Sequence, residues 1–369
     1  MPACFLFPPH FFDVEPPTAA MVYCVHSSFH HCMSIRVAIN GFGRVGRAAF
    51  RVALEKKNVQ VVGINDITEP KVLAHLLKYD TVYRTFPGKV EFSADALVVD
   101  GKRYPVSAIK EPDQLPWKKL RVDVVLECTG RFTSAAEAGR HLRAGAKRVV
   151  ISAPAKDDAT QTLVLGTVET RKRIHDKKAA EVVSNASCTT NCISPVIQVL
   201  ENAFGVQKAM MTTVHSYTAD QNLVDGPHRD LRRARAASQS MIPTSTGAAI
   251  ATTKVISSLR SRFDGIAIRV PTVCVSISDV TALLKKNATV DEVNAAFAAA
   301  EKDPLYAGVL GVSIAPLVSS DYIGDPRSAI VDPEFTRVVG GNLVKVLAWY
   351  DNEWGYAHRL VELAVAVSN

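Results

Sequence analysis

The sequence predicts an α/β fold in two parts, an N-terminal Rossmann-type parallel sheet followed by an α+β domain with a mostly antiparallel sheet. Residues 34–40 read as a buried strand, residues 41–46 as a glycine-rich turn, and a helical pattern then leads to a second strand at residues 59–65. From Ser187 onward the expected strands are longer and alternate more regularly. With 369 residues, the chain is long enough for two domains with buried cores.

The first domain continues this succession of strands and helices. We expect a strand over residues 122–127, a helix over residues 135–144 and a strand over residues 148–152. Parallel strands joined by crossover helices form a doubly wound sheet. The sequence therefore predicts one domain over residues 34–186.

The second domain is predicted from alternating apolar residues, which are typical of antiparallel strands with one covered face. The expected elements are strands over residues 208–215, 265–271, 274–284 and 342–350, and a helix over residues 289–300. We assign residues 187–351 to this domain and residues 352–369 to a terminal helical segment.

Composition narrows the possible functions. Hydrophobic residues make up 47% of the chain and charged residues 21%, and no stretch approaches the roughly 18 apolar residues of a membrane helix. The formal net charge of +7 suits anionic small molecules, so we expect nucleic-acid binding only as a secondary activity. The seven cysteines show no CxxC spacing, which argues against a metal site or a disulfide framework and favours a cytoplasmic location.

Residues 1–33 differ from the rest of the chain. They contain five prolines and four histidines but no lysine or arginine, unlike a signal or transit peptide. We expect either a wrongly assigned gene start or a disordered tail.

The glycine-rich turn predicts a dinucleotide site. Gly41, Gly43 and Gly46 follow a strand and open a helix, and Asp66 lies twenty residues beyond Gly46. This arrangement brings the backbone and a helix N-terminus close to a pyrophosphate, and the carboxylate can bind ribose hydroxyls. The carboxylate also repels a 2′-phosphate, so NAD is favoured over NADP. The alternative role for Asp66 is that of a turn or capping residue.

Cys188 is the predicted nucleophile. It lies between a short strand and a helical pattern, where backbone N–H groups favour the thiolate. His215, on an alternating strand, is the expected partner, and a pKa near neutrality would suit it as a general base. The alternative is an inert buried cysteine with a structural histidine.

A long basic segment over residues 216–241 shows little periodicity. Loops of this length in enzymes are usually functional. It also carries several apolar residues, namely Tyr217, Leu223, Val224, Leu231 and Met241. Such groups are too numerous to remain in solvent on a monomer, so we expect them to pack on another subunit.

Four motifs together resemble those of phosphorylating glyceraldehyde-3-phosphate dehydrogenases. They are residues 185–191 (NASCTTN), His215, residues 243–249 (PTSTGAA) and residues 349–356 (WYDNEWGY). The resemblance extends over residues 34–369. It implies that the enzyme oxidises and phosphorylates glyceraldehyde 3-phosphate with NAD, through a thioester on Cys188. It also implies a homotetramer, and a last helix that returns to the first domain of each chain.

The resemblance also assigns binding residues. For the substrate phosphate and inorganic phosphate it implies Ser187, Thr189, Thr218, Arg233, Thr246, Gly247 and Arg269. For NAD it implies, besides the glycines and Asp66, residues Arg44, Val45, Lys110, Thr129, Ser152 and Asn352. An erythrose-4-phosphate dehydrogenase of the same architecture is the nearest alternative. An aspartate-semialdehyde dehydrogenase is disfavoured by Asp66, and an RNA-binding or redox-sensing role remains open as a second activity.

Overall fold

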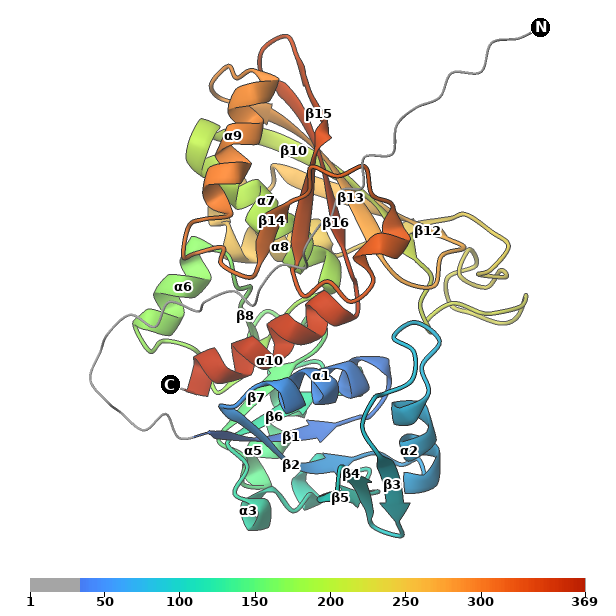
Figure 1. Cartoon of the computed structure of the whole chain (residues 1–369). Helices are drawn as coiled ribbons and strands as arrows, with labels where there is room; N and C mark the ends of the chain where they lie inside the picture. The colour runs from blue at the N-terminus through green and yellow to red at the C-terminus, as the bar shows by residue number, and fades with distance from the viewer. Residues whose placement is uncertain (1–33, 369) are drawn as a thin grey trace, which may run out of the picture. The chain divides into compact units, whose positions relative to one another are not determined.

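The N-terminal half of the computed structural model is built on a nine-stranded sheet (Figure 1). The structure describes residues 34–368, so the predictions for residues 1–33 lie outside the described residues. The strand order is β3-β4-β5-β2-β1-β6-β7-β9-β8. The pairs from β5 to β8 are parallel, whereas β3, β4 and β5 form an antiparallel meander, which the sequence did not predict.

The N-terminal half contains every strand predicted for it, together with elements that the sequence did not predict. Its elements are β1 (Ile35–Asn40), α1 (Arg44–Glu55), β2 (Val59–Asn65), α2 (Pro70–Lys78), β3 (Val90–Ser93), β4 (Ala96–Val99), β5 (Lys102–Ser107), α3 (Trp117–Leu120), β6 (Val124–Glu127), α4 (Ala135–Ala138), α5 (Arg140–Arg143), β7 (Arg148–Ile151), β8 (Gln161–Thr162), α6 (Val168–His175) and β9 (Val182–Ser184). The helix predicted over residues 135–144 is two short helices separated at Gly139, because glycine weakens a helix interior.

The C-terminal half contains a seven-stranded mixed sheet in the order β11-β12-β10-β13-β16-β15-β14. Its elements are α7 (Cys188–Phe204), β10 (Val206–Ser216), β11 (Ile242–Ser245), α8 (Ala248–Val255), β12 (Phe263–Val270), β13 (Ser276–Leu284), α9 (Val290–Ala300), β14 (Leu310–Val312), β15 (Ala329–Val339), β16 (Leu343–Tyr350) and α10 (Trp354–Ser368). Four of its six pairings are antiparallel, and β10 with β12 and β14 with β15 are parallel. The predicted fold class is confirmed.

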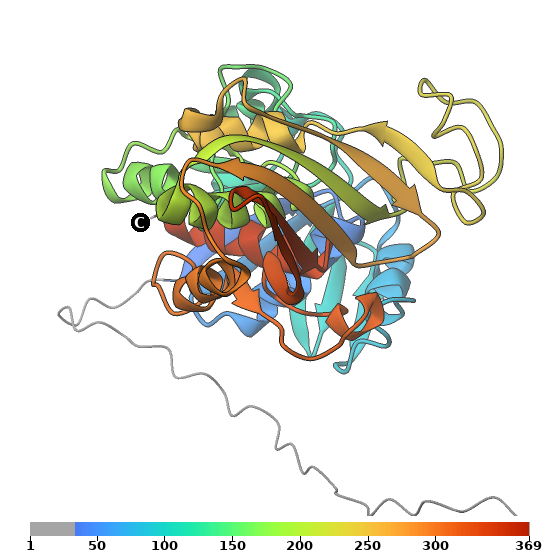
Figure 2. The ribbon, with the colours of Figure 1, turned by 90° about the horizontal axis from the view of Figure 1, so that it is seen from above.

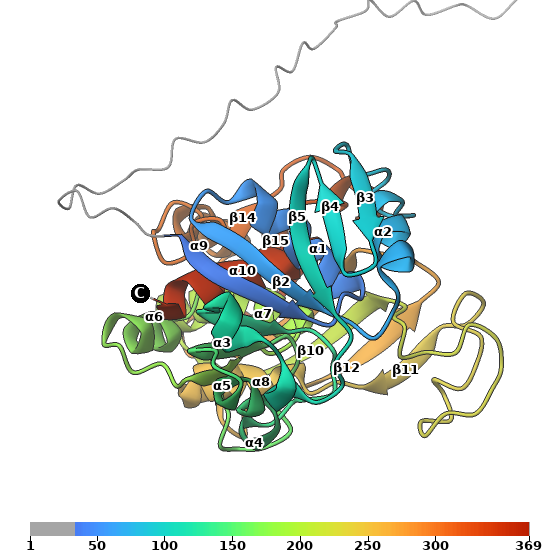
Figure 3. The same cartoon turned by 90° about the horizontal axis from the view of Figure 1, so that it is seen from below.

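Two cores stabilise these sheets. Helices α7, α8 and α9 pack on one face of the mixed sheet and share its core, which includes Val196, Val280 and Val346. Helix α10 packs against α1, and Leu360 and Leu363 belong to the core of the parallel sheet (Figures 1 and 3). The chain thus returns to the first sheet after completing the second. No helix within residues 34–368 is both long enough and apolar enough to cross a lipid bilayer.

Candidate active site

The three glycines in the turn from β1 into the first turn of α1 differ in what an added Cβ would meet. Gly41 has φ +91°, and a Cβ there would lie 2.7 Å from the backbone nitrogen of Thr129. A Cβ on Gly46 would lie 2.1 Å from the carbonyl oxygen of Gly41. A Cβ on Gly43, in contrast, would meet no protein atom within 4 Å. The space beside Gly43 is therefore open to a ligand, directly before the free N–H groups at the start of α1.

A cavity of about 260 Å³ lies at the carboxyl ends of the strands around this turn. Its lining includes five residues predicted to bind the cofactor, which are Gly41, Gly43, Asp66, Lys110 and Thr129. The Asp66 carboxylate accepts hydrogen bonds from the Phe42 N–H at 2.7 Å and the Thr68 N–H at 2.9 Å. Each oxygen retains a lone pair for a further donor, so these residues fit the ribose and phosphates of a dinucleotide.

Arg44, Val45 and Gly46 form the first turn of α1. The Arg44 guanidinium pairs with Glu353 at 2.5 Å and with Asp80 at 3.1 Å, which raises its pKa. The side chain of Arg44 is thus engaged by two carboxylates, and its backbone N–H is the group it can offer to a phosphate. Ser152 follows β7 at the same edge of the sheet.

A buried polar network beneath the cavity was not found from the sequence. The Glu127 carboxylate accepts hydrogen bonds from Asn40 at 2.5 Å, from the Thr129 N–H at 2.8 Å and from His141 Nε2 at 2.9 Å. Trp117 Nε1 donates to His141 Nδ1 at 2.9 Å, so the imidazole carries its proton on Nε2. In the sequence, only the position of Asn40 and Glu127 at the ends of predicted strands could have indicated this network.

Cys188 is the first residue of α7, and its Sγ lies 3.4 Å from His215 Nε2. The Ser187 hydroxyl caps the helix by accepting a hydrogen bond from the Thr190 N–H at 3.0 Å. Ala186 adopts a positive φ of 54°, a strained conformation immediately before this turn. The predicted thiol and imidazole are therefore in contact, 27 residues apart in sequence.

His215 is oriented by its neighbour. Its Nδ1 lies 2.7 Å from the Ser216 carbonyl oxygen and 2.5 Å from Nη1 of Arg269, which also donates to that oxygen at 3.1 Å. We assign the imidazole proton to Nδ1, facing the Ser216 carbonyl oxygen, and this tautomer directs the Nε2 lone pair toward Cys188. Together with the nearby Arg269 guanidinium, burial lowers the pKa of His215 to about 3, and burial raises the pKa of the Cys188 thiol. Both shifts favour a thiol paired with a neutral imidazole, in contrast to the histidine pKa near neutrality expected from the sequence.

The predicted phosphate ligands occupy varied environments. Arg269 lies beside the reacting pair, whereas the Arg233 guanidinium is engaged by Asp220 and by the Thr244 hydroxyl. The Thr189 hydroxyl contacts the Tyr350 hydroxyl at 3.0 Å, and its backbone N–H lies in the first turn of α7, where it has no partner within the helix.

The remaining predicted phosphate ligands lie on loops and at a helix start. Thr246 accepts a hydrogen bond from the Ala248 N–H at 3.2 Å at the start of α8, and the space beside Gly247 is open. The Thr218 N–H donates to the Gln221 side chain at 3.3 Å. No hydrogen bond within residues 34–368 links Thr218, Thr246 or Gly247 to Cys188.

Asn352 directly precedes Glu353, the partner of Arg44. Its side-chain oxygen accepts hydrogen bonds from the hydroxyls of Ser216 at 3.0 Å and Ser276 at 3.1 Å. Ser276 was not identified from the sequence, because its proximity depends on the register of β13 with β10 and β16.

A parallel sheet with a dinucleotide-type glycine turn, joined to a domain with a cysteine–histidine pair, defines a nicotinamide-dependent dehydrogenase with a covalent mechanism. Residues 35–135 match the family model for the NAD binding domain of glyceraldehyde 3-phosphate dehydrogenase, and residues 187–352 match the model for its C-terminal domain. The chain belongs to the glyceraldehyde-3-phosphate dehydrogenase family, and its cofactor is NAD.

Individual relatives agree with this assignment. The chain is 50% identical to the glyceraldehyde-3-phosphate dehydrogenase of Geobacillus stearothermophilus over 337 residues, which cover 91% of this chain and 99% of that protein. It is 51% identical to glyceraldehyde-3-phosphate dehydrogenase 1 of Bacillus cereus over 334 residues, or 90% of this chain and 98% of that protein.

Proposed function

We propose that this enzyme oxidises and phosphorylates glyceraldehyde 3-phosphate to 1,3-bisphosphoglycerate, with NAD and inorganic phosphate. The observation that carries the proposal is the 3.4 Å contact between Cys188 Sγ and His215 Nε2 at the start of α7, beside Arg269. The relatives' names support this reaction and disfavour the erythrose-4-phosphate alternative. The proposed division is a cofactor domain over residues 34–186, a catalytic domain over residues 187–351, and a terminal segment over residues 352–369.

The proposed reaction starts with the neutral pair. His215 Nε2 accepts the thiol proton as the Cys188 sulfur adds to the aldehyde carbon, and the imidazolium then gives this proton to the former carbonyl oxygen, which completes a hemithioacetal. Bound NAD supplies the hydride acceptor for oxidation of the hemithioacetal to a thioester. In that oxidation His215 removes the hydroxyl proton. An oxygen of inorganic phosphate then attacks the thioester carbon, and the Cys188 thiolate leaves.

The residues assigned to the substrate phosphate and to inorganic phosphate offer positive charge and backbone N–H donors. Arg269, together with Thr218 and Arg233, is assigned to the substrate phosphate. The attacking phosphate is assigned to Ser187, Thr189, Thr246 and Gly247. A phosphate at Arg269 would offset the charge that lowers the pKa of His215, so substrate binding favours proton acceptance by the imidazole.

A steady-state assay tests the reaction. NADH formation from glyceraldehyde 3-phosphate and NAD should require inorganic phosphate, because only phosphate releases the thioester efficiently. Erythrose 4-phosphate should be the poorer substrate. Phosphate-independent turnover with a preference for erythrose 4-phosphate would overturn the proposal.

We further propose a homotetramer. The loop over residues 217–241, between β10 and β11, projects from the rest of the described chain (Figures 1 and 2). Leu223, Val224, Leu231 and Met241 are between 69% and 82% exposed on this monomer. Surfaces of this kind are unusual in soluble monomers and are buried when a second copy covers them.

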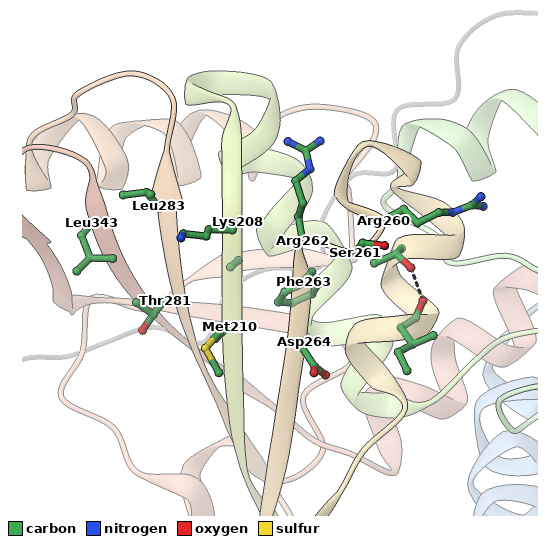
Figure 4. Close-up of a pocket in the computed structure, with 13 residues that line it drawn as sticks. Lys208, Met210, Arg260, Ser261, Arg262, Phe263, Asp264, Thr281, Leu283 and Leu343 are labelled. Carbon is green, nitrogen blue, oxygen red and sulfur yellow. Dashed lines mark hydrogen bonds between the residues drawn. The ribbon is translucent and has the colours of Figure 1, made fainter.

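The outer face of the mixed sheet supports the same assembly. Met210, Ile266 and Leu343 are at least 41% exposed there, on the face opposite α7. A hollow of about 990 Å³ lies at this face (Figure 4), where Met210 on β10, Thr281 on β13 and Leu343 on β16 come from adjacent strands. Light scattering should give four times the chain mass of 40.0 kDa. A stable, fully active monomer would contradict the assembly.

A cytoplasmic location and a secondary nucleic-acid activity remain predictions. Four free cysteines in the described residues, Cys128, Cys188, Cys192 and Cys274, fit a reducing compartment. Within residues 34–368 no cluster of His, Cys, Asp or Glu could hold a metal ion.

A further inference from the structure

Two buried serines hold the side-chain amide of Asn352. Its Oδ1 accepts the Ser216 hydroxyl at 3.0 Å and the Ser276 hydroxyl at 3.1 Å. All three residues are buried: Ser216 is 0% exposed, Ser276 2% and Asn352 8%. The amide nitrogen of Asn352 makes no hydrogen bond within residues 34–368, so its two N–H groups remain available for a ligand.

The two hydroxyls allow only one orientation of this amide. Ser276 Oγ also accepts the Ser216 backbone N–H at 3.1 Å, so its own hydrogen must point to another acceptor. If the amide turned over, the nitrogen would face both hydroxyls and leave two buried hydroxyl hydrogens without acceptors. Buried donors without acceptors are unfavourable, and the observed orientation is therefore retained.

The backbone on both sides of Asn352 is also anchored. The preceding Asp351 accepts hydrogen bonds from the Tyr83 hydroxyl at 2.8 Å and the Cys274 thiol at 3.3 Å. The following Glu353 pairs with Arg44 at the start of α1. With the backbone held at both neighbours, the remaining freedom is the rotation of the Asn352 amide, which the serines restrict.

Ser216 connects this amide to the reacting pair. Its carbonyl oxygen accepts the hydrogen bond from His215 Nδ1 at 2.7 Å, and its hydroxyl donates to Asn352. We propose that Ser216 and Ser276 are positioning residues that direct the Asn352 amide nitrogen toward the nicotinamide carboxamide and thereby fix which face of the ring meets the substrate. This inference rests on the proposed function and adds that Asn352, which the family resemblance assigns to NAD, binds that carboxamide.

Binding measurements separate this role from general support of the fold. ADP-ribose has the phosphates and ribose of NAD but lacks the nicotinamide. In the double variant Ser216→Ala/Ser276→Ala, the Kd for NAD should rise about tenfold, the value of one to two lost hydrogen bonds. The Kd for ADP-ribose, measured by calorimetry on the same preparation, should stay within about twofold. Ser278→Ala is the matched control, because this serine is also fully buried on β13 but its hydroxyl has no partner in the described residues.

The face of hydride transfer gives a second readout. With substrate deuterated at the aldehyde carbon, the wild type should place deuterium on one face of the NADH ring, as seen by NMR. The double variant should place a measurable fraction on the other face, and Ser278→Ala should not. In an Asn352→Ala background, the serine substitutions should change the NAD Kd by less than about twofold, because their target is gone.

The outcomes distinguish this inference from the proposed function. Equal weakening of NAD and ADP-ribose, or serine variants that match Ser278→Ala in affinity and in the labelled face, would overturn the positioning role while leaving the reaction intact. Failure of the wild type to form NADH from glyceraldehyde 3-phosphate would instead overturn the proposed function.

Discussion

The two halves of the site use different parts of the polypeptide. At the end of β1, the turn through Gly41 and Gly43 offers space and backbone N–H groups, and one carboxylate, Asp66, adds selectivity. At the start of α7, the reacting groups are side chains, and Cys188 meets His215 from β10. A backbone site depends on local conformation, whereas a side-chain site depends on the register of distant strands. Substitutions should therefore affect the two halves of the site differently.

The largest effect is expected at the reacting pair. Cys188→Ser should abolish NADH formation, because a serine hydroxyl is a far weaker acid than a thiol and gives up its proton to His215 much less readily. NAD affinity and the urea midpoint should stay nearly unchanged. His215→Asn should lower kcat by roughly a hundred- to ten-thousandfold, the usual contribution of a general base. Steady-state kinetics and calorimetry provide the readouts. Appreciable turnover by Cys188→Ser would show that another group is the nucleophile.

The glycines allow a comparison within the backbone site. Gly46→Ala should destabilise the fold by about 1–3 kcal/mol, because its Cβ would lie 2.1 Å from the Gly41 carbonyl oxygen. Gly43→Ala should change stability by less than about 0.5 kcal/mol, because the added methyl meets only open space. The same methyl should weaken NAD binding. Urea unfolding and NAD titration measure the two effects, and an unaltered NAD affinity in Gly43→Ala would place the pyrophosphate elsewhere.

In the cofactor-binding half of the site, we expect the Asp66 side chain to determine the preference for NAD over NADP. Asp66→Ala should weaken NAD binding by about 1.5–3 kcal/mol, the usual value of a hydrogen bond to a charged group. It should also narrow the preference for NAD over NADP, because the repulsion of a 2′-phosphate is lost. The ratio of kcat/KM for the two cofactors is the measurement. If that ratio does not change, Asp66 does not contact the ribose.

The lowered pKa of His215 predicts an effect of pH on stability. The folded state holds this imidazole neutral down to about pH 3, whereas the unfolded state protonates it near its ordinary value of 6.5. Its contribution to stability is thus present above pH 6.5 and is lost as pH falls toward 3. Between pH 6.5 and pH 5, protonation of His215 in the unfolded state should lower the free energy of unfolding of the wild type by roughly 2 kcal/mol. In His215→Asn this part of the pH dependence should be absent. Parallel pH profiles of the two urea midpoints would contradict the assignment.

The same contrast explains what the sequence could predict. The glycine spacing and the position of Cys188 between a strand and a helix are local patterns, and the structure has both features where the sequence placed them. Arg269 was predicted as a phosphate ligand from the motif resemblance and not from a local pattern. Arg44 pairs with Glu353, which is 309 residues away in the sequence, and Ser276 contacts Asn352, which is 76 residues away. Contacts between such distant segments could not be predicted from local patterns. The pKa of His215 could not be predicted either, because it depends on burial and on Arg269 from a neighbouring strand.

Trapping the thioester is the sharpest test of a covalent mechanism on Cys188. The enzyme is mixed with glyceraldehyde 3-phosphate and NAD without inorganic phosphate, and the intact mass and the digested peptides are measured. One phosphoglyceroyl group per chain should form on the peptide that contains Cys188, with one NADH released per group, and inorganic phosphate should then remove the label. A label on another residue, or NADH formation without any covalent adduct, would contradict the mechanism built on the Cys188–His215 pair.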